Sequence, residues 1–274
     1  MYPKLFEIGP FTVYSYGLMM GISFIIGSML LTSELKRKKL SPEMGSTITL
    51  IALIGGVAGS KILYLIESWT FFVADPIGMA FSPGGLTWYG GFLLATALIY
   101  FYVKKKKVHF LQIADAISPA LLLSYGIARI GCHLSGDGDY GFPTTLPWGA
   151  DYSHGTYPPS LAFRGFPEIT SQYPNGIVPD NTLCHPTPIY EFIICSILFF
   201  FLWKNREKII GEGKMFMWYL VAAGSERFAI EFLRLNPRLL FGLSEAQLIS
   251  LPLIALGIIG LLRKPPREQA GSHN

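Results

Sequence analysis

The sequence is poor in charge, because Asp, Glu, Lys and Arg make up 15% of its 274 residues whereas soluble proteins carry about 25%. It has only three cysteines, and their spacing predicts neither a disulfide framework nor a metal site. Its basic residues gather at the ends of apolar segments, so the net charge of +4 predicts no nucleic-acid partner. A lone lysine in the first ten residues and the lack of a small-residue cleavage pattern predict no cleavable signal peptide.

Apolar residues are abundant, at 51% of the chain, as is typical of membrane proteins that cross the bilayer several times. Seven apolar segments, each near the ~20 residues that a helix needs to cross a bilayer, lie at 11–34, 46–66, 85–103, 110–132, 187–203, 214–234 and 245–262. We therefore predict an all-α integral membrane protein with about seven transmembrane helices. Residues 1–264 would form a single membrane domain, and residues 265–274 a disordered cytoplasmic tail.

The orientation in the membrane follows from basic clusters that occur after every second segment. The clusters that follow segments one, three, five and seven are Lys36 to Lys39, Lys104 to Lys107, Lys204 to Lys208, and Arg263 with Lys264. Since cytoplasmic loops are enriched in Lys and Arg, these clusters place the N-terminus outside and the C-terminus in the cytoplasm.

A polar region rich in Gly, Pro and Tyr joins segments four and five, from His133 to His185. On the predicted topology it is the main extracytoplasmic loop region, with aromatic residues suited to the headgroup level. Cys132 and Cys184 both fall on the outer side, so a disulfide between them is weakly indicated.

Ionisable residues within an apolar segment are costly and are functional candidates by default. Segment six contains Arg227, Glu231 and Arg234, which share one helical face because they are four and three residues apart. The alternative is a structural ion-pair ladder that docks this helix to a neighbour. Together with Arg129, these arginines predict a phosphate site, because the planar guanidinium group binds phosphate through two hydrogen bonds.

The stretch from Arg129 to Gly141 lies at the end of segment four and concentrates candidate side chains. It brings Cys132, His133, Asp137 and Asp139 within ten residues of the arginine, among four glycines that let the backbone approach a bound group closely. This pattern is typical of a headgroup or anion pocket.

The other candidates each have a plain alternative. Tyr16 fits an outer aromatic belt, and Lys61 within segment two either seeks an acid or phosphate or extends to the interface. Tyr89 lies between glycine pairs at the start of segment three, where a broken or closely packed helix start is expected. Glu191 near the start of segment five is equally explained by the helix dipole or a cap.

Seven short motifs follow one another over nearly the whole chain: Tyr14–Met19, Gly59–Tyr64, Gly84–Gly91, Ala128–Gly141, His185–Glu191, Arg227–Arg234 and Leu243–Gln247. In these motifs and in their order the chain resembles the prolipoprotein diacylglyceryl transferases, integral membrane enzymes of bacteria. The stretch beginning at Arg227 matches the family pattern Arg-x-x-x-Glu-x-x-Arg. The chain departs from the family at Tyr89, where the family has histidine, at Cys132, where it has asparagine, and at Lys61, where it has arginine.

The resemblance implies a transferase that moves diacylglycerol from phosphatidylglycerol to the lipobox cysteine of a preprolipoprotein. The products would be a thioether and glycerol phosphate, with no cofactor and no metal required. The protein would be a multi-pass protein of the bacterial cytoplasmic (inner) membrane, in contact with membrane lipids.

The resemblance also implies roles for single residues. Arg129 and Arg227 would hold the phosphate, and Tyr89, His133 or Asp139 would accept the thiol proton. The residues that would orient these groups or complete the pocket are Tyr16, Lys61, Asp137, Asp139, Gly141, Tyr190, Glu191, Glu231 and Arg234. Two alternatives stay open: a transferase of the same fold with another acceptor, and a non-catalytic phospholipid-binding homologue.

Overall fold

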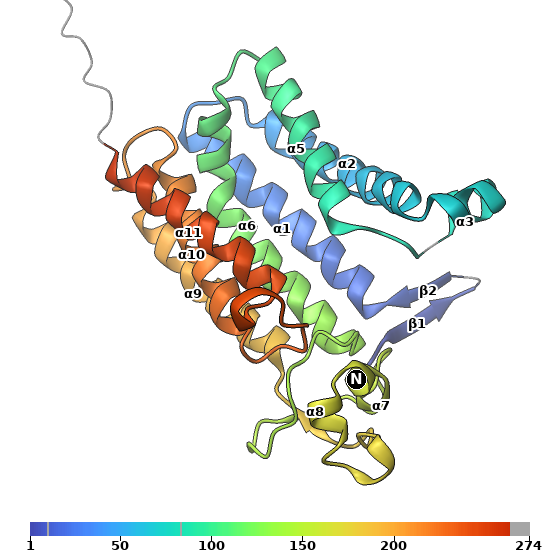
Figure 1. The fold of residues 1–274 in the computed structure, drawn as a ribbon. Helices are drawn as coiled ribbons and strands as arrows, with labels where there is room; N and C mark the ends of the chain where they lie inside the picture. Colours follow the sequence, from blue (N-terminus) through green and yellow to red (C-terminus); the bar gives the residue numbers. More distant parts are fainter. Residues whose placement is uncertain (10, 83, 264–274) are drawn as a thin grey trace, which may run out of the picture. The chain divides into compact units, whose positions relative to one another are not determined.

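A computed structural model describes residues 1–9, 11–82 and 84–263 of the chain (Figure 1). The described chain is mostly helical and forms two compact units. One unit comprises Met1–Ile26 and the described residues from Ser118 onward, and the other comprises Gly27–Ile117. The expected tail at 265–274 lies outside the described residues.

Among the described residues, seven long helices overlap the seven apolar segments. They are α1 (Ser15–Arg37), α2 (Glu43–Glu67), α5 (Trp88–Lys105), α6 (Phe110–Ser135), α9 (Thr187–Asn205), α10 (Lys214–Ile230) and α11 (Glu245–Leu262). Five of them are long and apolar enough to cross a membrane, namely α1, α2, α6, α9 and α11. The prediction of a helical membrane protein with several spans is therefore confirmed.

The N-terminus differs from the prediction, because residues 11–14 are not helical. Phe11–Tyr14 forms strand β2, which pairs antiparallel with β1 (Lys4–Ile8), and Val13 lies opposite Phe6 in the register. Helix α1 begins only at Ser15. A short apolar run before a helix cannot be told from the helix by hydropathy alone, so the predicted segment began four residues too early.

In the unit Gly27–Ile117, helices α2 and α5 pack closely through glycines. A Cβ on Gly59 would lie 2.3 Å from the carbonyl oxygen of Gly90, and a Cβ on Gly91 would lie 2.4 Å from Ser60 Oγ. Only residues without side-chain bulk allow the backbones to approach so closely, which confirms the close packing expected from these glycines. The short helices α3 (Trp69–Ala74) and α4 (Pro76–Phe81) lie between α2 and α5 in the chain.

In the other unit, α9, α10 and α11 pack side by side (Figure 1). Gly257 of α11 allows this, because a Cβ there would lie 2.7 Å from Val221 of α10. Lys214 at the start of α10 donates to the carbonyl oxygens of Gly260 and Leu261, which lie in the last turn of α11, at 2.8 and 2.9 Å. Helix α6 contacts α9 where Gly126 meets Cys195.

The polar region between α6 and α9 folds around a small core of its own. The buried residues of this core are Tyr140, Tyr152, Phe163, Ile169, Val178 and Cys184. The secondary structure of the region consists of α7 (Pro159–Ala162), η1 (Phe163–Gly165), α8 (Pro167–Thr170), η2 (Pro174–Gly176), and the paired strands β3 (Ala150–Asp151) and β4 (Leu183–Cys184). Helix α6 runs to Ser135, so the region begins three residues later than expected. Cys132 and Cys184 are free thiols, so the indicated disulfide was wrong.

Candidate active site

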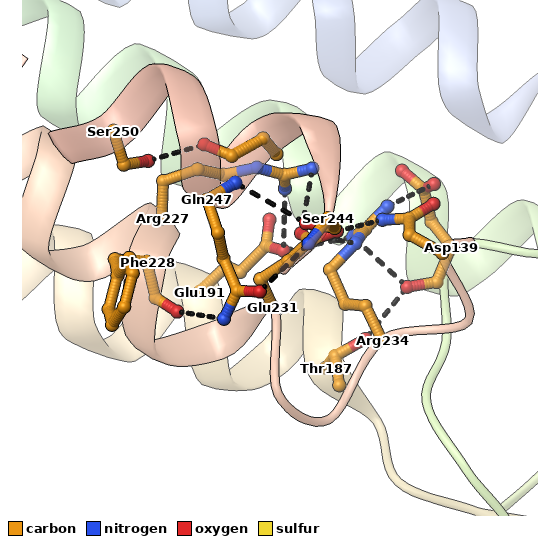
Figure 2. A network of polar contacts seen from close by, with 12 residues as sticks. Asp139, Thr187, Glu191, Arg227, Phe228, Glu231, Arg234, Ser244, Gln247 and Ser250 are labelled. Carbon is orange, nitrogen blue, oxygen red and sulfur yellow. Dashed lines mark hydrogen bonds and ion pairs between the residues drawn. The ribbon is translucent and has the colours of Figure 1, made fainter. Parts of the chain in front are cut away.

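Six charged side chains from four parts of the chain meet in one network. Figure 2 labels all of its members except Arg129. Arg129 lies near the C-terminal end of α6, Glu191 in the second turn of α9, and Arg227 in the last turn of α10. The other members are Glu231 and Arg234, just beyond α10, and Asp139, in the segment after α6. The ends of three helices therefore supply most of the site.

Glu191 is the carboxylate that all three arginines share, and its side chain is fully buried. Its Oε1 accepts from Nη1 of Arg234 at 2.9 Å and lies 3.6 Å from Nη1 of Arg227. Its Oε2 pairs with Nε of Arg129 and accepts from the Tyr125 hydroxyl at 2.9 Å. A buried carboxylate is tolerated only when it is paired and hydrogen-bonded in this way.

Asp139 bridges two arginines through its two carboxylate oxygens. Oδ1 accepts from Nη2 of Arg234 at 2.5 Å, and Oδ2 pairs with Nη1 of Arg129. Its backbone carbonyl oxygen is held separately by Thr187 Oγ1, at 2.7 Å, and by Nη1 of Arg234, at 3.2 Å. Burial alone would raise the pKa of this carboxyl, but the charges of Arg234 and Arg129 outweigh it and hold the pKa at about 2. Asp139 is therefore ionised at neutral pH.

The chain after α10 folds back in a way that fixes Glu231 and Arg234. Glu231 is fully buried, and its Oε2 lies 3.1 Å from Nη2 of Arg227 and 3.8 Å from Nε of Arg234. Gly141 forms an antiparallel bridge with Arg234, where a Cβ on residue 141 would lie 2.3 Å from the Leu233 carbonyl oxygen. Glycine at this position thus allows the segment that carries Asp139 to run directly against Arg234.

Helix α11 supports the same turn through Gln247, which is fully buried. Gln247 forms a capping box with Ser244 and donates to the Phe228 carbonyl oxygen at 3.2 Å (Figure 2). Its Oε1 also accepts from Arg238, whose other Nη donates to the backbone oxygen of Glu231 at 3.0 Å. The start of α11 and the end of α10 are thereby fixed to each other.

Three arginine donors in the network have no hydrogen-bond partner among the described residues. Nε of Arg129, Nη1 of Arg227 and Nε of Arg234 are buried, and each lies near a carboxylate oxygen without forming a hydrogen bond to it. Within the ion-paired network three guanidinium groups face three carboxylates, so its formal charge is zero. Buried donors without partners are rare in native proteins, and at a cluster of arginines they favour an anionic ligand.

One group of side chains has the spacing of a metal site but not its chemistry. The ligand atoms of Cys132, Asp137 and Asp139 all lie within 4.8 Å of one another. The Asp139 carboxylate is already bound by two guanidinium groups, and Nη1 of Arg129 also donates to Cys132 Sγ at 3.5 Å. A cation would have to displace these positive groups, so we assign no metal to this group.

The structure brings six of the predicted site residues into the network: Arg129, Asp139, Glu191, Arg227, Glu231 and Arg234. Asp137 lies beside it and accepts from the backbone N–H of Asp139 at 3.2 Å. Tyr16 lies against α6, because a Cβ on Gly131 would be 3.2 Å from the Tyr16 Cα.

Two other predicted residues of this unit contact the polar region between α6 and α9. His133 Nδ1 lies 2.9 Å from the Tyr152 hydroxyl, and the two rings pack edge to face. Tyr190 accepts from the indole N–H of Trp148 at 2.9 Å.

Lys61 and Tyr89 belong to the unit Gly27–Ile117. The ammonium group of Lys61 donates to Ser82 Oγ and to the carbonyl oxygens of Ser82 and Gly84, at 2.8 to 2.9 Å. Lys61 thus fastens the segment that leads into α5. Tyr89 lies in the first turn of α5.

Sequence reasoning missed Tyr125 and Thr187. The Tyr125 hydroxyl accepts from Nη2 of Arg129 at 2.8 Å while it donates to Glu191, and Thr187 holds the backbone of Asp139. Tyr125 lies one helical turn before Arg129, and that spacing could have identified it. Thr187 left no comparable signal, since its partner is 48 residues away.

Fold and network together define a membrane protein with several spans and a buried arginine–carboxylate site. A family model described as prolipoprotein diacylglyceryl transferase matches residues 3–263. The chain therefore belongs to the prolipoprotein diacylglyceryl transferase family.

Individual relatives agree with the family model. A phosphatidylglycerol–prolipoprotein diacylglyceryl transferase of Clostridium tetani is 32% identical over 260 residues, which cover 94% of this chain and 96% of the relative. Proteins of the same name from Nostoc sp. and Dehalococcoides mccartyi are 32% and 28% identical, over 96% and 99% of this chain and 91% and 97% of the relatives. The similarity thus extends over nearly the full length of both partners in each pair.

Proposed function

We propose that this protein is a phosphatidylglycerol–prolipoprotein diacylglyceryl transferase. Its reaction would transfer diacylglycerol from phosphatidylglycerol to the lipobox cysteine of a preprolipoprotein, with glycerol phosphate as the leaving group. The observation that carries the proposal is the convergence of Arg129, Arg227 and Arg234, each with one buried donor that lacks a hydrogen-bond partner, in a chain of this family.

The arrangement supports specific roles in this chemistry. Arg129 and Arg227 would bind the phosphate and stabilise the charge that develops on the leaving phosphate ester. Arg234 and Glu231 would orient them, Glu191 would hold all three arginines together, and Tyr16, Asp137, Gly141 and Tyr190 would complete the pocket. The resemblance also implies a substrate-binding role for Lys61, whose contacts in the structure are with Ser82 and Gly84 of its own unit.

The acceptor of the thiol proton differs from that of the family, because Tyr89 stands where the family has histidine. Asp139 is a poor acceptor while two arginines hold its pKa at about 2. His133 carries an imidazole, a side chain suited to proton transfer, and its Nδ1 lies 2.9 Å from the Tyr152 hydroxyl. We therefore propose His133 as the acceptor, with Tyr89 as the alternative.

Three variants separate these two residues in a transfer assay with a lipobox peptide. We expect a severe loss in His133→Gln, a modest loss in Tyr89→Phe, and retained or improved transfer in Tyr89→His. A His133→Gln protein as active as the parent, together with an inactive Tyr89→Phe protein, would show that tyrosine is the essential group.

We further propose seven spans, with the N-terminus outside and the C-terminus in the cytoplasm of the bacterial inner membrane, and residues 1–264 acting as one membrane domain. The four basic clusters support this orientation. A single cysteine introduced after Lys107 should be protected from an impermeant thiol reagent added outside, whereas one in the 150–180 segment should react. Reaction at both positions would overturn the topology.

The experiment that tests the function in cells is complementation of a bacterium depleted of its own transferase. We expect this chain to restore growth and the lipidation of exported lipoproteins. Because tyrosine replaces the family histidine, a second candidate function is that of a non-catalytic phospholipid-binding homologue; a transferase with another acceptor is the third. Stable expression without lipidation would favour either of these over the proposed reaction.

A further inference from the structure

The three carboxylates of the arginine network differ in exposure and in setting. The side chains of Glu191 and Glu231 are 0% exposed, and both lie in or directly after helices. The side chain of Asp139 is 32% exposed and lies in the irregular segment after α6, with two glycines of positive φ before it and Gly141 after it. Asp139 is therefore the only one of the three that can move without unpacking a helix.

The Asp139 carboxylate also binds as a phosphodiester would. One oxygen contacts Arg129 and the other contacts Arg234, so two acceptor atoms of a single anion bridge two guanidinium groups. The two unesterified oxygens of a phosphodiester present the same pair of acceptors. We infer that Asp139 is the resident anion of this site, and that the headgroup phosphodiester takes its place on Arg129 and Arg234. This inference rests on the proposed function, because that function supplies the phosphodiester.

Charge makes an exchange more favourable than simple addition. The network pairs three guanidinium groups with three carboxylates, so a phosphodiester added to it would leave one buried negative charge without a partner. Uncompensated charge in a buried membrane site costs several kcal/mol or more. When the Asp139 carboxylate moves into solvent as the phosphodiester enters, the buried network stays neutral.

The contacts of Asp139 permit this movement without a change of the backbone. Its carbonyl oxygen stays bound by Thr187 Oγ1 and by Nη1 of Arg234, so only the side chain has to rotate. Rotation frees Nη1 of Arg129 and Nη2 of Arg234, which are the two donors that the Asp139 carboxylate holds. These two donors are then available to the oxygens of one phosphate group.

The exchange gives the site a preference among phosphate ligands. A phosphodiester carries one negative charge and replaces Asp139 without changing the charge of the network. The leaving group, glycerol phosphate, is a phosphomonoester and carries about 1.5 to 2 negative charges at pH 7. Its exchange for Asp139 would leave excess negative charge in the network. Asp139 therefore competes for the arginines more effectively against glycerol phosphate than against the phosphodiester of the substrate. Asp139 is thus a residue that determines specificity and favours release of the leaving group.

The test measures the binding of glycerophosphoglycerol, the deacylated phosphodiester headgroup, to the full chain in phosphatidylcholine nanodiscs by calorimetry. Asp139→Asn keeps the shape of the side chain but removes the competing charge, so we expect binding at least tenfold tighter than in the parent, or about 1.4 kcal/mol. Asp139→Ser should shift the affinity in the same direction, which guards against a folding defect peculiar to asparagine. Asp139→Glu keeps a competing carboxylate and should stay within about threefold of the parent.

Asp151→Asn is the matched control, because it removes a negative charge from the polar region between α6 and α9 without changing the arginine network. Asp151 accepts from the backbone N–H of Ser153 and, among the described residues, forms no ion pair with arginine. We expect parent affinity in this variant. Unchanged or weaker binding in both Asp139→Asn and Asp139→Ser would overturn the inference.

The binding assay tests the exchange of Asp139, and the transfer assay tests the proposed function, so the two can be judged independently. If the parent transfers diacylglycerol to a lipobox peptide while the Asp139 variants bind no more tightly, the proposed function stands and the exchange is wrong. If the parent transfers nothing but the neutral variants bind the headgroup more tightly, the exchange stands for a lipid-binding protein.

Discussion

Replacing Glu191 by glutamine removes the carboxylate that holds Arg129, Arg227 and Arg234 together while it keeps the shape of the side chain. Glutamine can still accept from Tyr125, so the change is confined to one charge at a site with no solvent exposure. Removing one partner of a buried ion pair costs about 3–5 kcal/mol, because the remaining charge is left without compensation. We expect a loss of this size in the free energy of unfolding.

The assay is reversible unfolding of the full chain by SDS in mixed micelles, followed by tryptophan fluorescence. Glu207→Gln is the control, since Glu207 is exposed beyond the end of α9 and such changes stay within about 0.5 kcal/mol. In a double-mutant cycle, Glu191→Gln and Arg234→Gln should couple by about 0.5–3 kcal/mol. A loss below about 1 kcal/mol in Glu191→Gln, or additive effects in the cycle, would show that Glu191 does not hold the network together.

Three other outcomes follow from the structure. Arg129→Lys and Arg227→Lys keep the positive charge but lose the guanidinium group that binds phosphate through two hydrogen bonds. Each variant should lose most transfer activity while it stays folded. Full activity in both variants would place the phosphate elsewhere. Gly59→Ala should destabilise the protein by about 1–3 kcal/mol, because the added methyl group meets the backbone of α5, whereas Gly56→Ala, with open space around it, should be near neutral in the same unfolding assay. Folding lowers the pKa of Asp139 from 3.8 to about 2, so its ion pairs stabilise the protein fully above pH 3.8 and are lost as the pH falls through about 2. The free energy of unfolding should therefore fall by about 2 kcal/mol over this range in the same unfolding assay. This loss should be absent in Asp139→Asn.

The helices were predictable because the interior of a bilayer imposes one strong rule on sequence. A span needs about 20 apolar residues, and the segments predicted at 46–66 and 245–262 correspond to α2 and α11 with little change. The hairpin at the N-terminus was not predictable in this way. Phe11–Tyr14 is apolar, and only its pairing with β1 distinguishes it from the helix that follows.

The site was predictable where its residues lie close together in the sequence. The spacing of Arg227, Glu231 and Arg234 correctly predicted that the three lie together, and the structure pairs both arginines with Glu231. The predicted shared helical face was wrong, because α10 ends at Ile230 and the chain turns beyond it. The contacts of Glu191 and Asp139 were not predictable from spacing, because they join α9 and the segment after α6 to residues 43 and 95 positions away. From its position in the sequence, Glu191 fits a helix-capping role equally well, and only its three arginine partners distinguish the two roles.

Transfer by the purified protein is the most direct test of the proposed activity. The full chain in nanodiscs that contain phosphatidylglycerol is incubated with a lipobox peptide, and the peptide is analysed by mass spectrometry together with the released glycerol phosphate. The account predicts a peptide that carries one diacylglyceryl group on its cysteine, one equivalent of glycerol phosphate, and neither product when Arg129 and Arg227 are both replaced by lysine. An unmodified peptide with the parent protein, in nanodiscs where the headgroup binds, would contradict the assignment of this chain as a transferase.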